Sequence, residues 1–263
     1  MNRIDTLFTT LAAGGKKAFI AYIVAGDPSL DHTVDIVSGL ERAGVDLIEL
    51  GIPFSDPLAD GVVNQLGAQR ALASGTTVGG ILDTVQRIRA GSAIPIVLFT
   101  YYNPIFHFGM DAFTRRATAS GVDGALILDL PPEEAAREWP AGGLKRITLV
   151  APTTPPERIR HIVPTASGFI YYVSRAGVTG MREQIAADLA ARLAPIRAAS
   201  PLPVCVGFGV SKPEHAAAIA KVADGVIVGS AIVNHIAGLG ASADLGEKVR
   251  AFVEPLVKAT HQA

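Results

Sequence analysis

The sequence has one cysteine, Cys205, so it cannot form an intrachain disulfide or a paired-cysteine metal site. Its 23 basic and 24 acidic residues give a net charge of -1, and neither sign forms a run. This balance argues against an extended nucleic-acid or membrane surface. Residues 14–17 (GGKK) interrupt the first hydrophobic stretch, so no long apolar helix is predicted there. A reducing cytoplasmic location is therefore the default expectation, and any anionic ligand must be bound by local groups.

Short apolar runs alternate with turns rich in Gly, Pro and Asp and with longer amphipathic segments. This alternation favours parallel β-α units over hairpins. Eight runs are predicted to be strands: Phe19–Val24, Val45–Leu50, Ile94–Tyr101, Gly124–Leu128, Arg146–Val150, Gly168–Val173, Pro203–Val206 and Gly225–Val228.

Helices are predicted between the strands and at both ends of the chain. They are Ile4–Ala13, Leu30–Ala43, Val78–Ala90, Met110–Ala119, Pro132–Glu138, Pro155–Ile162, Ile185–Ala198, Lys212–Ala220 and Leu245–His261. Eight units in 263 residues predict an α/β fold, a single (β/α)8 barrel domain over residues 1–263. The first helix is extra and is expected to cover the bottom of the barrel. A doubly wound open sheet is the rival architecture.

The segment ELGIPFSDPLADG, residues 49–61, places one carboxylate at the end of a strand and two more on the following loop. Glu49 ends the apolar run VDLIEL, and Pro53 and Pro57 prevent regular structure after it. Asp56 and Asp60 can therefore turn back toward the strand end. Two carboxylates in different environments can take separate acid and base roles, although most loop aspartates only cap turns.

Glycines follow the last three predicted strands, in SRAGVTG (174–180), GFGVS (207–211) and GS (229–230). Small residues allow backbone N–H groups to approach an anion, and the helices that begin afterwards add a favourable dipole. Barrels frequently bind phosphate after these strands. The glycines indicate a phosphate site, although each group alone could be an ordinary strand-to-helix turn.

Seven motifs together resemble the tryptophan synthase alpha subunit family. They are AYIVAGDP (21–28), ELGIPFSDPLADG (49–61), TYYNPIF (100–106), GVDGALILDLPPEE (121–134), YYVSRAGVTG (171–180), VGFGVSKPE (206–214) and GVIVGSAIV (225–233). The resemblance implies a (β/α)8 barrel that cleaves indole-3-glycerol phosphate to indole and glyceraldehyde 3-phosphate, in L-tryptophan biosynthesis.

The resemblance also assigns residues to roles. Glu49 matches the main acid/base near indole C3 and the side-chain hydroxyl, and Asp60 matches the carboxylate that accepts the indole N–H. Thr179 matches a threonine that contacts the Asp60 loop when the site closes. The remaining matches are Tyr171 beside the glutamate, Gly180, Gly209, Gly229 and Ser230 as main-chain phosphate donors, and Phe208 packed beside them.

The indole ring needs a flat apolar slot, which Tyr22, Phe99, Leu126 and Ile127 at neighbouring strand ends could form, although most such residues are core. The sequence departs from the family next to this slot. After ADG the family usually continues with proline and has an apolar residue near position 64, whereas this chain has Val62 and Asn64. Ala21 also replaces a common proline. None of these changes removes a catalytic group.

The resemblance further implies a beta subunit as partner, in an alpha2beta2 tetramer, with pyridoxal phosphate (PLP) on that subunit and no cofactor in this chain. The six histidines lie mainly in helical or loop segments away from the motifs, so no metal is expected. In the family, the loops after strands two and six lie toward the partner, with Asp56 nearby and Asn103 and Pro104 beyond strand three. Asp129 is expected to be a structural acceptor for loop backbone. Two alternatives remain open: a stand-alone indole-releasing lyase, and a non-catalytic phosphate-binding regulatory barrel.

Overall fold

The computed structural model describes residues 2–139, 143–174, 182–207 and 209–263, without the side chains of residues 182–186. The described residues form nine short strands in one sheet: β1 (Ala18–Val24), β2 (Leu47–Gly51), β3 (Ile96–Thr100), β4 (Gly124–Ile127), β5 (Lys145–Arg146), β6 (Thr148–Val150), β7 (Ile170–Val173), β8 (Val204–Gly207) and β9 (Gly225–Val228). Their order is β5-β4-β3-β2-β1-β9-β8-β7-β6, and the paired strands are parallel.

The sheet closes into a barrel through the predicted fifth strand. β5 and β6 stand at the two ends of the strand order, yet only Ile147 separates them in the chain. The Ile147 N–H donates to the Ala125 carbonyl at 3.0 Å, and the Ser167 N–H donates to the Arg146 carbonyl at 2.9 Å. The two short strands are therefore one barrel strand, and the eight-stranded prediction is confirmed over the open sheet.

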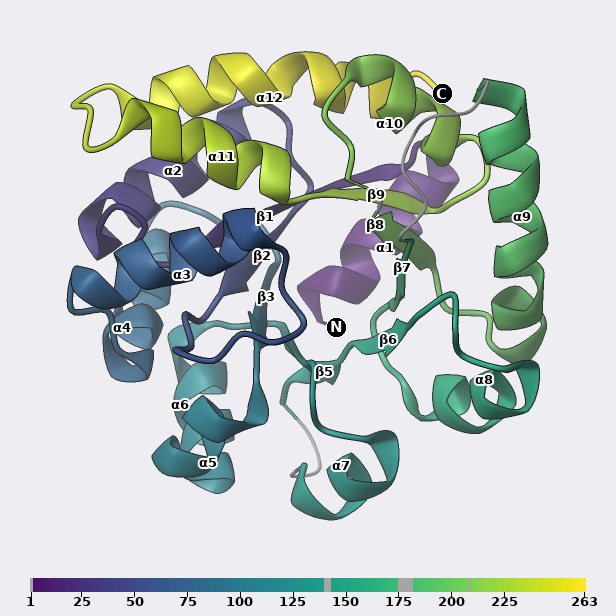
Figure 1. The fold of residues 1–263 in the computed structure, drawn as a ribbon, viewed down its shortest axis with the longest axis horizontal. Coiled ribbons are helices and arrows are strands. Elements are labelled where there is room, and N and C mark those ends of the chain that lie inside the picture. The colour runs from purple at the N-terminus through teal and green to yellow at the C-terminus, as the bar shows by residue number, and fades with distance from the viewer. Residues whose placement is uncertain (1, 140–142, 175–181, 208) are drawn as a thin grey trace.

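Helices surround the strands (Figure 1). Those that sequence predicted are α1 (Arg3–Ala13), α2 (Leu30–Arg42), α4 (Val78–Arg89), α6 (Met110–Ser120), α7 (Pro132–Glu138), α8 (Pro156–Ile162), α9 (Arg182–Ala199), α10 (Pro213–Ala220) and α12 (Leu245–His261). Sequence analysis missed α3 (Val62–Ala73), α5 (Tyr102–Phe108), the 3-10 turn Val163–Thr165 and α11 (Ser230–Leu239).

Alternate residues of the strands point into the barrel. The interior cluster includes Ala18 and Ile20 of β1, Leu47 of β2 and Val97 of β3. Because side chains on a strand alternate with period two, Glu49 shares the inward face with Leu47. The other face of each strand packs on the surrounding helices in a larger hydrophobic cluster. The barrel interior is thus filled with apolar side chains, and Glu49 adds a carboxyl group toward the carboxyl end of β2.

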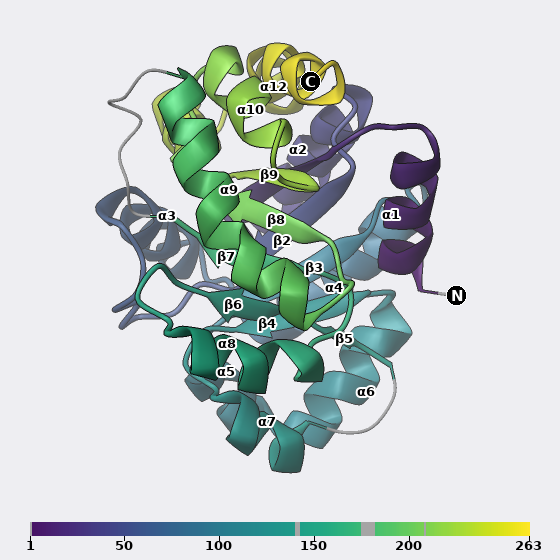
Figure 2. The same ribbon diagram turned by 90° about the vertical axis from the view of Figure 1, so that its right-hand side faces the viewer.

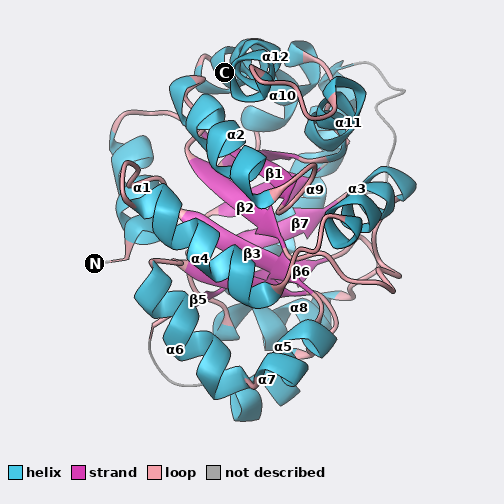
Figure 3. Cartoon of the chain, turned by 90° about the vertical axis from the view of Figure 1, so that its left-hand side faces the viewer, coloured by secondary structure: helices cyan, strands magenta, loops and turns pink. Residues whose placement is uncertain are grey.

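Helix α1 closes the barrel at the amino ends of the strands, as the sequence predicted. Asn2 caps it by accepting a hydrogen bond from the Ile4 N–H at 2.9 Å, and Ile4 and Phe8 join the interior cluster. In Figures 2 and 3, α1 and α3 lie on opposite sides of the strands. Helix α3 follows the carboxyl end of β2, so the functional site is expected at the end away from α1.

Candidate active site

Glu49 is a fully buried carboxyl group on β2. Its register partner on β1 is Tyr22, and the exposed fraction of Glu49 is 0%. Both carboxyl oxygens lack a hydrogen-bond partner within the described parts of the chain. Burial raises the pKa of Glu49 to about 8, because the charged form loses its hydration. The group is therefore protonated at neutral pH, in the state that a general acid requires.

Three aromatic side chains lie close together near Glu49. The ring of Phe99 stands edge-on to Tyr22, with centroids 5.2 Å apart, and lies 6.3 Å from the ring of Tyr171. Burial, followed by the charges of nearby carboxylates including Glu49, raises the pKa of both tyrosines. Glycines make room for the hydroxyl groups, since a Cβ atom on Gly51 would lie 2.6 Å from the Tyr22 oxygen and one on Gly207 2.7 Å from the Tyr171 oxygen.

Asp60 is held by groups from two neighbouring elements. The Tyr101 hydroxyl, just after β3, donates to Asp60 Oδ2 at 2.8 Å and accepts from the Ala59 N–H at 2.9 Å. Burial raises the pKa of Asp60, whereas hydrogen bonds from Tyr101 and from the Asn64 side chain act in the opposite direction. These bonds favour the ionised carboxylate. Sequence analysis did not single out Tyr101, although its place at the end of the strand beside β2 could have indicated it.

Two of the residues predicted to bind phosphate, Gly229 and Ser230, lie at the start of α11, a helix that was not predicted from the sequence. Gly229 is the N-cap of α11 and Ser230 its first residue, so the positive end of the helix dipole lies at this loop. Gly209 adopts a φ of +62°, which L side chains rarely reach. A Cβ atom on Gly229 would lie 3.1 Å from the ring of Tyr22, so this glycine also allows the tyrosine to pack.

A cavity of about 420 Å³ joins the aromatic residues to the glycine loops. Of the predicted site residues, Tyr22, Phe99, Tyr171, Gly209, Gly229 and Ser230 line it. Leu126, the register partner of Phe99, belongs to the interior cluster and is not among the residues that line the cavity, and Ile127 faces the helix layer. Thr179, Gly180 and Phe208 fall outside the described residues. A cavity of this size is typical of a small-ligand site.

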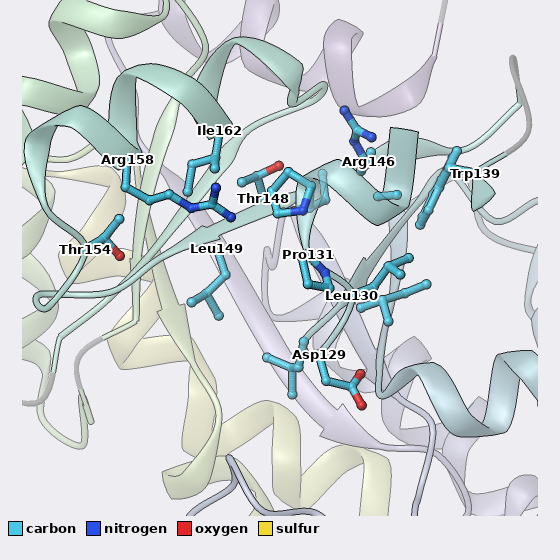
Figure 4. Close-up of a pocket in the computed structure, with 15 residues that line it drawn as sticks. Asp129, Leu130, Pro131, Trp139, Arg146, Thr148, Leu149, Thr154, Arg158 and Ile162 are labelled. Atoms are coloured by element: carbon cyan, nitrogen blue, oxygen red, sulfur yellow. The ribbon is translucent and has the colours of Figure 1, made fainter. Parts of the chain in front are cut away.

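Another cavity, of about 330 Å³, lies outside the barrel between α7 and α8 (Figure 4). Trp139, Arg146 and Arg158 are among the side chains around it. Arg158 is already paired with Glu133. Asp129 accepts a hydrogen bond from the Tyr102 N–H at 2.6 Å, which is the structural role that the sequence predicted. The aromatic residues near Glu49 and the glycines of the predicted phosphate loops line the 420 Å³ cavity and not this one, so we place the site inside the barrel mouth.

Within the described residues, no group of three or more His, Cys, Asp or Glu side chains is arranged to hold a metal ion. In the same part of the chain, no helix is both long enough and apolar enough to cross a membrane.

Comparison with known proteins decides the family. A family model described as tryptophan synthase alpha chain matches residues 8–261. The chain belongs to the tryptophan synthase alpha chain family. A relative of that name from Opitutus terrae is 50% identical over 99% of both chains, and one from Citrifermentans bemidjiense is 50% identical over 97% of both. The structure of tryptophan synthase subunit alpha from Legionella pneumophila superposes with a TM-score of 0.90, at 40% identity, covering 99% of this chain and 98% of that one.

Membership of the tryptophan synthase alpha chain family gives the reaction. The chain is a lyase that cleaves indole-3-glycerol phosphate into indole and glyceraldehyde 3-phosphate. The predicted fold and reaction are therefore confirmed, and as an alpha chain the protein has a beta chain as its expected counterpart. The residue roles follow as proposals from the geometry of the site.

Proposed function

We propose that Glu49 and Asp60 divide the acid and base work of this cleavage. The observation that carries the proposal is the fully buried Glu49 carboxyl, unpaired among the described residues and with a pKa of about 8. A neutral carboxylic acid can protonate carbon, whereas an ionised one cannot. Asp60, with two hydrogen bonds that favour its charged form, suits the complementary role of a fixed anion.

The proposed cycle returns each group to its starting state. Glu49 donates its proton to indole C3, and positive charge develops on the ring nitrogen. Asp60 accepts the N–H hydrogen bond and stabilises that charge. The Glu49 carboxylate then removes the proton from the side-chain hydroxyl. The electrons of that O–H bond form the new C=O bond of the aldehyde, and the electrons of the broken C–C bond restore the indole ring and neutralise the charge on its nitrogen.

The remaining substrate contacts follow the cavity from the aromatic residues to the glycine loops. Tyr22, Phe99 and Tyr171 form the slot for the indole ring, with Leu126 packed beneath it. The main chain at Gly209, Gly229 and Ser230 binds the phosphate, supported by the N-terminus of α11. We extend the phosphate role to Gly180 and Phe208 and the loop-closure role to Thr179 from the family resemblance alone.

We further propose that the chain works with a beta subunit in an alpha2beta2 tetramer, with PLP on the beta subunit. Two exposed apolar side chains support a protein interface at this end of the barrel: Leu58, on the loop after β2, is 92% exposed, and Phe106, in α5 after β3, is 64% exposed. This chain then supplies indole to its partner. Residues 1–263 act as one barrel domain, and the cytoplasm is the location expected of an enzyme of amino-acid biosynthesis.

The test is indole release from indole-3-glycerol phosphate by the purified chain, with and without an added beta subunit. Stimulation by the beta subunit supports the tetramer proposal, because an order change in the loops on partner binding can shift the population toward the active state. Full activity of the isolated chain would instead indicate a stand-alone lyase. If folded chains release no indole in either condition, the non-catalytic regulatory barrel would be indicated.

A further inference from the structure

Asn64 is a polar residue at an otherwise largely apolar wall of the substrate cavity. It is the third residue of α3 and lines the 420 Å³ cavity together with Tyr22, Phe99 and Tyr171. It also lines a small enclosed space of about 10 Å³ that it shares with Asp60. Its Oδ1 atom is buried and has no hydrogen-bond partner within the described residues. An unpaired buried acceptor of this kind is unfavourable unless a ligand or a water molecule supplies a donor.

The orientation of the amide follows from its neighbour. The Asn64 side chain makes a hydrogen bond that favours the ionised form of Asp60. A hydrogen bond that lowers the pKa of a carboxyl group is one that is donated to it, so the amide nitrogen of Asn64 faces Asp60. The Oδ1 atom is then turned away from that carboxylate. Asp60 and Asn64 together offer two acceptors beside the aromatic slot.

An unsubstituted indole ring has a single hydrogen-bond donor, its N–H group. In the proposed function that donor is taken by Asp60, which leaves the Asn64 oxygen unpaired in the complex. The shared space of about 10 Å³ is close to the volume that one water-sized atom requires. A hydroxyl or amino group on the ring has this size and carries the missing donor.

We propose that Asn64 is a specificity-determining residue that favours indole rings bearing a second hydrogen-bond donor, a hydroxyl or an amino group. The substrate class of the site then includes ring-hydroxylated and ring-aminated indole-3-glycerol phosphates. This inference rests on the proposed function, because it assumes that Asp60 occupies the ring N–H. Asn64 selects among substrates and takes no part in proton transfer.

The test is the reverse condensation of indoles with glyceraldehyde 3-phosphate by the wild-type chain and by Asn64→Leu, which keeps the approximate size of the side chain. Hydroxyindoles substituted at each benzene-ring position are compared with methylindoles substituted at the same position, which match them in size and lack the donor. At one or more positions, the hydroxy-to-methyl ratio of kcat/KM is expected to be about tenfold higher in wild type than in Asn64→Leu, as expected for one hydrogen bond to a buried acceptor.

Gln65→Leu is the matched control. Gln65 is exposed and donates to the main-chain oxygen of Asp60 at 2.9 Å, so this change removes an amide near Asp60 without touching the carboxylate. It should leave the hydroxy-to-methyl ratio at the wild-type value. Equal ratios in wild type and Asn64→Leu at every ring position would overturn the inference. If the wild type fails to condense indole itself, the proposed function falls instead, and calorimetric affinities for the same pairs of indoles then decide the role of Asn64.

Discussion

At the scale of single residues, the site depends on two carboxyl groups in different surroundings. Burial without a partner in the described residues raises the pKa of Glu49 to about 8. Burial also raises the pKa of Asp60, but the hydrogen bonds from Tyr101 and Asn64 oppose that rise. Two carboxyl groups can thus take different roles: Glu49 donates a proton, and Asp60 accepts a hydrogen bond. What separates the two is the number of hydrogen-bond donors around each carboxyl group.

Tyr101→Phe is expected to impair the reaction most at low pH. The change removes the 2.8 Å hydrogen bond to Asp60, so the pKa of Asp60 rises and the ionised form is lost at a higher pH. A lost hydrogen bond to a charged group corresponds to about 1.5–3 kcal/mol, or roughly ten- to a hundredfold in kcat/KM. The measurement is the pH profile of indole release, whose acidic limb should move to higher pH.

Tyr102→Phe provides the control for this prediction. The Tyr102 hydroxyl donates to Glu138 at 3.1 Å on the exposed outer side, away from Asp60. Its removal should leave the acidic limb in place. If both variants gave the wild-type profile, Tyr101 would have no part in setting the charge of Asp60.

At the scale of elements, the position of α3 determines where Asp60 and Asn64 lie. Helix α3 begins two residues after Asp60 and is joined to the turn after β1 by Arg70. The guanidinium of Arg70 donates to both carboxyl oxygens of Asp27, at 2.9 and 2.7 Å, and Asp27 is 3% exposed. A bidentate pair of this kind fixes orientation as well as distance. The turn after β1 thereby helps to position α3, the helix that follows β2.

Arg70→Met should destabilise the fold by about 3 kcal/mol, because it leaves the buried Asp27 carboxylate without its partner. It should also lower kcat, since α3 loses its ion pair to the turn after β1. The measurements are the free energy of unfolding in urea and the rate of indole release. Arg87→Met is the control, since the Arg87–Asp31 pair is exposed and should contribute at most about 1 kcal/mol. Equal losses in both variants would contradict this role for Asp27.

The sequence predicted the strands better than it predicted the helices beside the site. The strands are short runs rich in Val and Ile, a pattern that indicates buried parallel strands. Helix α3 was missed because its pattern is reversed, with Gly67, Ala68 and Ala71 buried while Val62 and Leu66 are exposed. Helix α11 follows β9 after one residue, in the apolar run GVIVGSAIV, so no change of periodicity marks where it begins.

The candidate site was predictable to the extent that topology determines it. Parallel strands of a barrel end at one rim, so Glu49, Phe99 and Tyr171 could be placed together from their strand positions. The sequence could not show that Leu126 packs in the interior cluster without lining the cavity, or that Tyr101 reaches Asp60. Both depend on how far each side chain extends, which the period-two pattern does not specify.

At the scale of the whole molecule, the buried acid makes stability depend on pH. The pKa of Glu49 rises from 4.5 to about 8 on folding, so the folded protein binds a proton that the unfolded chain has released. The free energy of unfolding is therefore not reduced by Glu49 below pH 4.5, and it falls as the pH rises toward 8. Glu49→Gln removes this dependence. Its gain in unfolding free energy over wild type should grow from near zero at pH 4.5 to on the order of 4 kcal/mol at pH 8, at about 1.4 kcal/mol per pH unit.

Denaturant unfolding of both proteins between pH 4.5 and 9 checks this prediction. Glu157→Gln serves as the control, because Glu157 is an exposed residue at the start of α8 and its replacement should change stability by no more than about 0.5 kcal/mol. A stability difference between Glu49→Gln and wild type that stays constant with pH would mean that Glu49 is not the buried acid described above.

The acid role of Glu49 is tested most directly by the pH dependence of indole release from indole-3-glycerol phosphate by wild type and by Glu49→Gln, each with the beta subunit present. The wild-type rate should fall above about pH 8, where Glu49 loses its proton. Glu49→Gln should be slower than wild type by about 10²–10⁴-fold, the usual contribution of a positioned acid or base. A folded Glu49→Gln protein that releases indole at the wild-type rate would contradict the acid role of Glu49.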